Sequence, residues 1–193
     1  VKAEVKNLPD PPKATLFDIK SPILLEAVEF LVEKRYMKAF PDGSFRAEQP
    51  IKRLEALDIF LRLSRIHFSH PLEYLKEQRS KNYSDVKPTD KFAGLAFVAK
   101  DEGWLEGKRL LGSQPITKID FVRGLMEAYI GYEKPEDNKA LLRQFKDLKR
   151  ASSAISHLSF AHGKGLLDKT KKFMPQKKIN RGEAAIILYR LLK

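Results

Sequence analysis

Six charged residues recur at matching places in three segments of this chain of 193 residues. An aspartate opens each segment, and a basic residue follows it after 35, 33 and 34 positions. The pairs are Asp18 and Arg53, Asp85 and Lys118, and Asp147 and Arg181. Each basic residue falls in the expected first turn of a helix, beside backbone N–H groups that an isolated helix leaves unpaired. A cation in that position favours a carboxylate or a phosphate, so the pattern predicts anion binding.

The segments that carry these residues are copies of one helix–loop–helix unit. In each copy the aspartate precedes a branched apolar residue, then apolar residues at helical spacing, then a loop rich in Gly, Pro and Lys. An apolar loop anchor stands six residues before the isoleucine that opens the second helix. These pairs are Phe45 and Ile51, Leu110 and Ile116, and Phe173 and Ile179. Because both spacings agree, we interpret the chain as a triplicated unit.

One such hairpin has too little core to fold alone, whereas three can share a core. We therefore expect an all-α protein with a pseudo-three-fold bundle of three units. The expected divisions are a proline-rich arm at 1–16, repeats at 17–66, 83–131 and 145–193, and connector helices at 67–82 and 132–144.

The second helices of the three units begin differently. Thr117 with Asp120, and Asn180 with Glu183, have the spacing of a capping box, in which side chains and backbone N–H groups pair reciprocally. Lys52 occupies the same place in the first unit and has no capping group. The start of that helix should therefore be weaker by about 1 kcal/mol.

The composition restricts the partners. There are 37 Lys and Arg against 25 Asp and Glu, a formal charge of +12, which favours nucleic acid, acidic glycans or an anionic membrane face. Much of the excess lies between Lys146 and Arg181. Cysteine is absent, so a disulfide framework, a thiolate metal site and a Cys nucleophile are excluded. No apolar run approaches the roughly 18 residues that a membrane span needs.

No recognised catalytic pattern occurs in the sequence. The GxSxG, P-loop, dinucleotide and HExxH patterns are missing. Two histidine pairs, His67 with His70 and His157 with His162, lack the pattern of a metal site, so we expect surface or partly buried histidines. We therefore expect a non-catalytic protein with no metal or cofactor.

The repeated unit resembles the S-layer homology domain. The most specific stretch is "FPDGSFRAEQPIKRLEA" at residues 40–56, and the segments "IKRLE", "ITKID" and "INRGE" resemble the I-T-R-A-E-like pentad of that family. The resemblance covers residues 17–193, and the second and third copies are more divergent. It implies three tandem domains in a trefoil, with ligand grooves between neighbouring units.

The resemblance also implies a function: non-catalytic anchoring in the bacterial cell envelope. The ligand would be an anionic, often pyruvylated, secondary cell-wall polymer or a peptidoglycan-linked glycan. Position by position, the family's groove-lining set transfers to Arg53, Lys118, Arg181, Asp18, Asp85 and Asp147. An arginine would grip a carboxylate bidentately, which Lys118 is unable to do. The aspartates would accept hydrogen bonds from sugar hydroxyls, and an aromatic residue such as Trp104 or Tyr36 would stack on a sugar face.

This interpretation places the protein outside the cell, at the cell wall, the S-layer or the periplasmic face of an outer membrane. It would be a monomeric module of a larger surface protein or S-layer assembly, with no membrane insertion and no nucleic acid. Replacing Arg53 and Arg181 with alanine would weaken binding to the polymer without lowering the melting temperature.

Simpler roles stay open for the same residues. The arginines fit solvated or ion-paired side chains, the aspartates fit helix caps or loop braces, and Trp104 fits the core better than a sugar site. For the whole chain, the charge of +12 leaves nucleic-acid binding as a second hypothesis. A helical scaffold that binds a protein partner is the third.

Overall fold

The computed structural model describes residues 15–64, 82–130, 139–148 and 153–193. Within these ranges the chain forms α-helices and three isolated β-bridges, with no strand, which confirms the all-α class. The helices are α1 (Pro22–Glu33), α2 (Arg53–Leu63), α4 (Ala93–Asp101), α5 (Lys118–Ile130), α6 (Lys139–Gln144), α7 (Ile155–Gly163) and α8 (Arg181–Leu192).

Two helices lie within each of the three repeat ranges. Each repeat supplies a first helix (α1, α4 or α7) and a second helix (α2, α5 or α8), and α6 lies within the predicted connector at 132–144. The predicted arm at 1–16 lies outside the described residues except for its last two. The predicted connector at 67–82 lies outside them except for its last residue.

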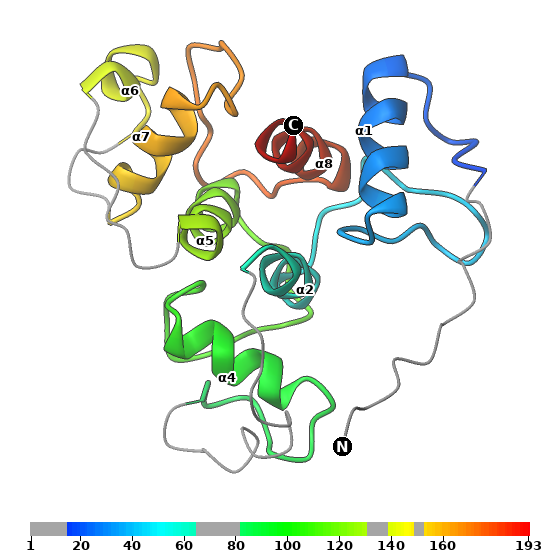
Figure 1. The fold of residues 1–193 in the computed structure, drawn as a ribbon. Coiled ribbons are helices and arrows are strands. Elements are labelled where there is room, and N and C mark those ends of the chain that lie inside the picture. Colours follow the sequence, from blue (N-terminus) through cyan, green and yellow to red (C-terminus); the bar gives the residue numbers. More distant parts are fainter. Residues whose placement is uncertain (1–14, 65–81, 131–138, 149–152) are drawn as a thin grey trace, which may run out of the picture.

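The first helix of each repeat packs against the second helix of the preceding repeat. Helix α4 packs on α2, α7 packs on α5, and α1 closes the cycle by packing on α8. Figure 1 shows the three second helices around the centre, seen nearly end-on, with α1, α4 and α7 outside them. The repeats are therefore interlocked, and the core is shared between them.

A ring of backbone hydrogen bonds joins the three repeats at the centre. The N–H of Ile51 donates to the carbonyl of Ile179 at 3.0 Å, that of Ile179 donates to Ile116 at 3.2 Å, and that of Ile116 donates to Ile51 at 2.9 Å. The three β-bridges flank these contacts. All three isoleucines are fully buried. The six-residue spacing that the three units share therefore places one isoleucine from each unit at the centre.

Close packing between α5 and its neighbours depends on a glycine. A Cβ added at Gly124 would lie 2.5 Å from the carbonyl oxygen of Trp104 and 2.6 Å from Cε2 of Phe60. These distances are too short for any side chain, so the helix can approach this closely only at glycine. Trp104 and Phe60 meet there edge to face, with ring centroids 6.4 Å apart.

Candidate functional site

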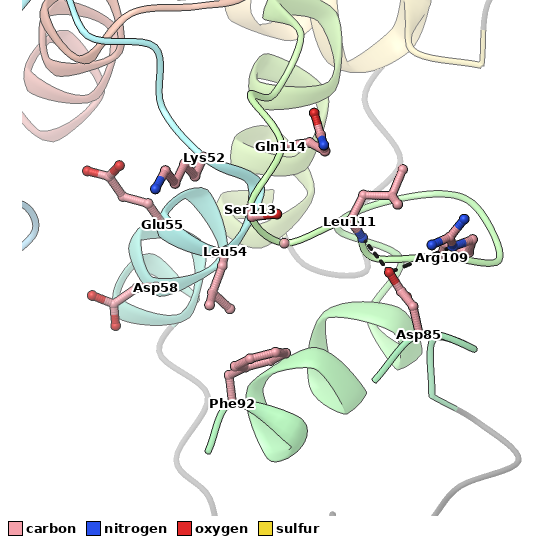
Figure 2. A pocket seen from close by; sticks show the side chains of 11 residues that line it. Lys52, Leu54, Glu55, Asp58, Asp85, Phe92, Arg109, Leu111, Ser113 and Gln114 are labelled. Carbon is pink, nitrogen blue, oxygen red and sulfur yellow. Dashed lines mark hydrogen bonds and ion pairs between the residues drawn. The ribbon is translucent and has the colours of Figure 1, made fainter. Parts of the chain in front are cut away.

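One groove lies between repeats 1 and 2. Its volume is about 810 Å³. One wall comes from the start of α2, and the other comes from the loop of repeat 2 and the residues before α4 (Figure 2). The lining residues are Lys52, Leu54, Glu55, Asp58, Asp85, Phe92, Arg109 and Leu111 through Gln114.

A second groove, of about 410 Å³, lies in repeat 1. It is lined by Asp18 through Ser21, by Leu24, and by the loop from Arg46 to Gln49. The same loop contacts the start of α8, because the N–H groups of Arg181 and Gly182 donate to the carbonyls of Gln49 and Ala47. The smaller groove therefore lies beside the contact between the loop of repeat 1 and the helix start of repeat 3. The larger groove lies beside the matching contact between the loop of repeat 2 and the helix start of repeat 1.

The leading aspartates brace the loops of their own repeats. The two carboxylate oxygens of Asp85 accept hydrogen bonds from the N–H groups of Leu110 and Leu111, at 2.7 and 2.9 Å. Asp18 holds Phe45 and Arg46 in the same way, and Asp147 holds Phe173 and Met174. In each loop the second of these residues has a positive φ, between 53° and 59°. This conformation is uncommon outside glycine, and the aspartate stabilises it.

These hydrogen bonds also alter the acidity of the aspartates. Burial alone would raise the pKa of Asp18, Asp85 and Asp147, but the two loop N–H donors outweigh it and leave each pKa below its ordinary value. Asp85 and Asp18 line the larger and the smaller groove respectively. In each groove, therefore, the aspartate that holds the loop also forms part of the groove wall.

Arg181 lies inside the protein. Only 3% of the residue is exposed. Its Nε donates to the carbonyl of Phe45 at 2.8 Å, one Nη donates to the carbonyl of Lys38 at 2.6 Å, and the other pairs with Glu55. The guanidinium thus joins the start of α8 to the loop and second helix of repeat 1.

Arg53 and Lys118 occupy the equivalent positions with fewer contacts. The Nε of Arg53 donates to the carbonyl of Leu110 at 2.6 Å, and its Nη1 lies 3.6 Å from Asp120. Lys118 is 8% exposed, and its ammonium lies 5.1 Å from the centre of the Phe173 ring. Each basic residue therefore reaches toward the loop anchor of the next repeat.

The backbone N–H groups beside these basic residues are already paired. Arg53 and Leu54 donate to the carbonyls of Gln114 and Gly112, and Lys118 and Ile119 donate to those of Lys177 and Pro175. The expectation of unpaired N–H groups at these helix starts is therefore wrong. It fails because the loop of the neighbouring repeat folds against each helix start and supplies carbonyl acceptors.

The predicted differences in side-chain capping are present. Asn180 and Glu183 form a reciprocal capping box at the start of α8, and the hydroxyl of Thr117 accepts the N–H of Asp120 at 3.2 Å. Lys52 makes no side-chain cap on α2. The ring of Trp104 lies in the core, with 1% of the residue exposed, as expected from its packing role. It presents no open face for a sugar.

The candidate residues thus separate into two groups. Asp18 and Asp85 line the two grooves, whereas Arg53, Lys118, Arg181, Asp147 and Trp104 line neither. Sequence reasoning did not assign Lys52, Phe92 or Arg109 to a site. The missing cap at Lys52 was the available signal for that residue.

The described histidines are paired with side chains of neighbouring helices. His157 pairs with Glu127 and His162 with the side-chain oxygen of Gln144 at 2.8 Å. The described residues contain no group of three or more His, Asp or Glu side chains arranged to hold a metal ion. Among those residues, no helix has the length and apolarity to cross a membrane. His67 and His70 lie outside the described residues.

Comparison with known families identifies two segments of the chain. The S-layer homology domain matches residues 19–57 and 144–185. The first match contains the leading aspartate's neighbour Ile19, α1, the loop and the start of α2, and the second contains the corresponding parts of repeat 3. A search of curated proteins finds no match to the chain.

Proposed function

Because this chain contains S-layer homology domains, we propose that it is a non-catalytic module that anchors a protein to the cell wall by binding a wall glycan. The observation that carries the proposal is the matched unit in repeats 1 and 3, together with a groove of about 810 Å³ beside repeat 1. The same proposal assigns the protein to the exported fraction, at the cell surface.

We further propose that the glycan is an anionic wall polymer, with pyruvylated sugars as one source of carboxylates. The formal charge of +12 supports an anionic partner. Within the larger groove, Lys52 and Arg109 supply positive charge, and the partly exposed ring of Phe92 offers an apolar face for a sugar. Gln114 and Ser113 add donors and acceptors suited to hydroxyl groups.

Under this proposal the predicted residues divide their roles. Asp85 and Asp18 contribute to the groove walls and face the sugar, and Arg53, Lys118 and Arg181 hold the loops that form those walls. Asp147 does the same for the loop of repeat 3. Binding would therefore respond to changes at all six residues. For Arg53, Lys118 and Arg181 the effect would act through the shape of the groove.

The test is sedimentation of the purified chain with wall sacculi. We expect the chain to sediment with intact sacculi and to stay in the supernatant when the attached anionic polymer has been chemically stripped. Undiminished sedimentation with stripped, neutral sacculi would contradict the anionic ligand and leave a peptidoglycan-linked one. No sedimentation with either preparation would contradict anchoring itself.

A further inference from the structure

Lys52 departs from the pattern of the other two repeats at a position next to the larger groove. Its backbone has the extended conformation of an N-cap, with φ −80° and ψ 151°, but its side chain makes no capping bond. At the equivalent positions, Thr117 accepts the N–H of Asp120 at 3.2 Å and Asn180 accepts that of Glu183 at 2.7 Å. Repeat 1 therefore lacks a stabilising contact that both other repeats have.

Nothing in the local backbone compensates for the missing cap. The carbonyls of Gln114 and Gly112 accept the first two N–H groups of α2, but repeats 2 and 3 have the same pair of bonds in addition to their side-chain caps. A residue that breaks a local rule without a structural gain is expected at a functional position. Lys52 is such a residue, and it lines the larger of the two grooves.

The surroundings leave the ammonium of Lys52 available. The residue is exposed, and among the described residues no hydrogen bond or ion pair involves its side chain. The two acids nearest to it on α2 have other cationic partners, because Glu55 pairs with Arg181 and Asp58 lies 3.2 Å from Arg62. Figure 2 shows Lys52 at the start of α2, with its side chain directed to the side where Glu55 lies, and Arg109 at the other end of the groove.

The residue equivalent to Lys52 at the start of α8 is Asn180, which does not line the smaller groove. The amide nitrogen of Asn180 donates to the carboxylate of Glu48 at 3.2 Å, and Glu48 itself lines that groove. A neutral amide, hydrogen-bonded to a carboxylate, thus stands at the position that Lys52 occupies beside the larger groove. The two repeats therefore differ in charge at this one position, although their backbones are related.

We propose that Lys52 is the residue that binds the anionic group of the wall polymer, a carboxylate or a phosphate, in the groove between repeats 1 and 2. The inference rests on the proposed function. The paired backbone N–H groups of α2 have no part in it, and Arg53 does not supply the cation, because its guanidinium is held by Leu110 and Asp120. The ammonium of Lys52 acts as a point charge with three donors.

The decisive variant is Lys52→Thr. It removes the charge and gives repeat 1 the same capping hydroxyl that Thr117 provides in repeat 2. We expect a higher melting temperature, because the cap is regained. We also expect the Kd for wall polymer purified from sacculi to rise by about tenfold or more, as for loss of a charged hydrogen bond. A purely structural role for Lys52 would not move stability and affinity in opposite directions.

Two further variants complete the experiment. Lys52→Arg keeps the charge and should bind within about threefold of the unmodified chain, a difference under 1 kcal/mol. Lys20→Thr is the matched control, because Lys20 is an exposed lysine of the smaller groove and its loss changes net charge equally. We expect no comparable loss of affinity for Lys20→Thr. An equal loss in both threonine variants would mean that only net charge matters, and would overturn the assignment.

The outcomes separate this inference from the proposed function. If the unmodified chain does not bind the polymer, the proposed function fails and the inference fails with it. If the unmodified chain and Lys52→Thr bind equally, the inference alone is overturned. Carbodiimide amidation of the polymer removes carboxylates and leaves phosphodiesters. An affinity difference that disappears after amidation identifies a carboxylate as the partner of Lys52, and a difference that persists identifies a phosphate.

Discussion

Replacing Arg181 with alanine should lower the free energy of unfolding by about 3–5 kcal/mol. The side chain is buried, and its guanidinium donates to the carbonyls of Phe45 and Lys38 and pairs with Glu55. Alanine would leave the carbonyl of the fully buried Phe45 without its donor, and would remove the cation from Glu55 and from the carbonyl of Lys38. The binding role proposed for Arg181 from the sequence predicted no such change in stability, so the two expectations are opposed.

The magnitude follows from the contacts. Three hydrogen bonds to a charged group contribute about 1.5–3 kcal/mol each. Against them stands the cost of burying the cation. Burial lowers the pKa of Arg181 to about 10, a shift from its ordinary value that corresponds to about 3 kcal/mol. The net loss is then centred on about 4 kcal/mol, within the range for breaking a buried ion pair by removing one partner.

Equilibrium unfolding in urea measures this change directly. The matched control is Arg190→Ala in the same helix, α8. Arg190 also donates to a carbonyl and pairs with an acid, Leu166 at 3.1 Å and Asp168 at 2.9 Å, but its side chain is 40% exposed. We expect its loss to cost less than about 1 kcal/mol. If Arg181→Ala is destabilised no more than Arg190→Ala, the structural role assigned to Arg181 is refuted.

Three other predictions follow from the same contacts. The three leading aspartates have lowered pKa values, so the stability they contribute is complete above the ordinary pKa of 3.8 and is lost as pH falls through the lower folded pKa. The melting temperature should therefore fall between pH 6 and pH 2. The fall should be smaller in Asp85→Asn, which has one titrating carboxylate fewer. Gly124→Ala should lower the melting temperature sharply because its Cβ has no room, whereas Gly163→Ala, with no atom within 4 Å, should be neutral or raise it. Lys169, Lys171 and Lys172 are exposed in the loop of repeat 3. Replacing all three with glutamine should change the free energy of unfolding by less than about 0.5 kcal/mol in urea titrations. A larger loss would mean that the charged loop supports the fold.

Much of the fold follows from spacing within one repeat. The interval from Phe45 to Ile51 and its two counterparts predicted a shared arrangement, and the structure joins the three isoleucines in one ring. The capping differences at Lys52, Thr117 and Asn180 were likewise predictable, because capping depends on residues only three positions apart. Local patterns of this kind need no knowledge of the partner segment.

The partners of the basic residues were not predictable in the same way. Arg53 and Arg181 bind backbone carbonyls of another repeat, and a carbonyl is present at every residue, so the sequence carries no mark of which one accepts. The same holds for the helix starts, whose N–H groups are taken by loops more than 50 residues away. The sequence indicated that these positions carry cations and N–H donors. It did not indicate that contacts with another repeat already occupy those donors.

The hydrogen-bonded ring at the centre limits how such a chain can evolve. In an open solenoid a repeat can be added or lost at an end, because each unit contacts only its neighbours. Here the contacts of Ile51, Ile116 and Ile179 return to their starting point, and α1 is packed on α8. Deleting one repeat would leave an unpaired buried donor and acceptor and an uncovered helix, and a fourth would have no place in the ring. The number of repeats is therefore set by closure of the fold rather than by how many ligands are bound, which leaves individual repeats free to diverge in charge, as the pair at Lys52 and Asn180 has done.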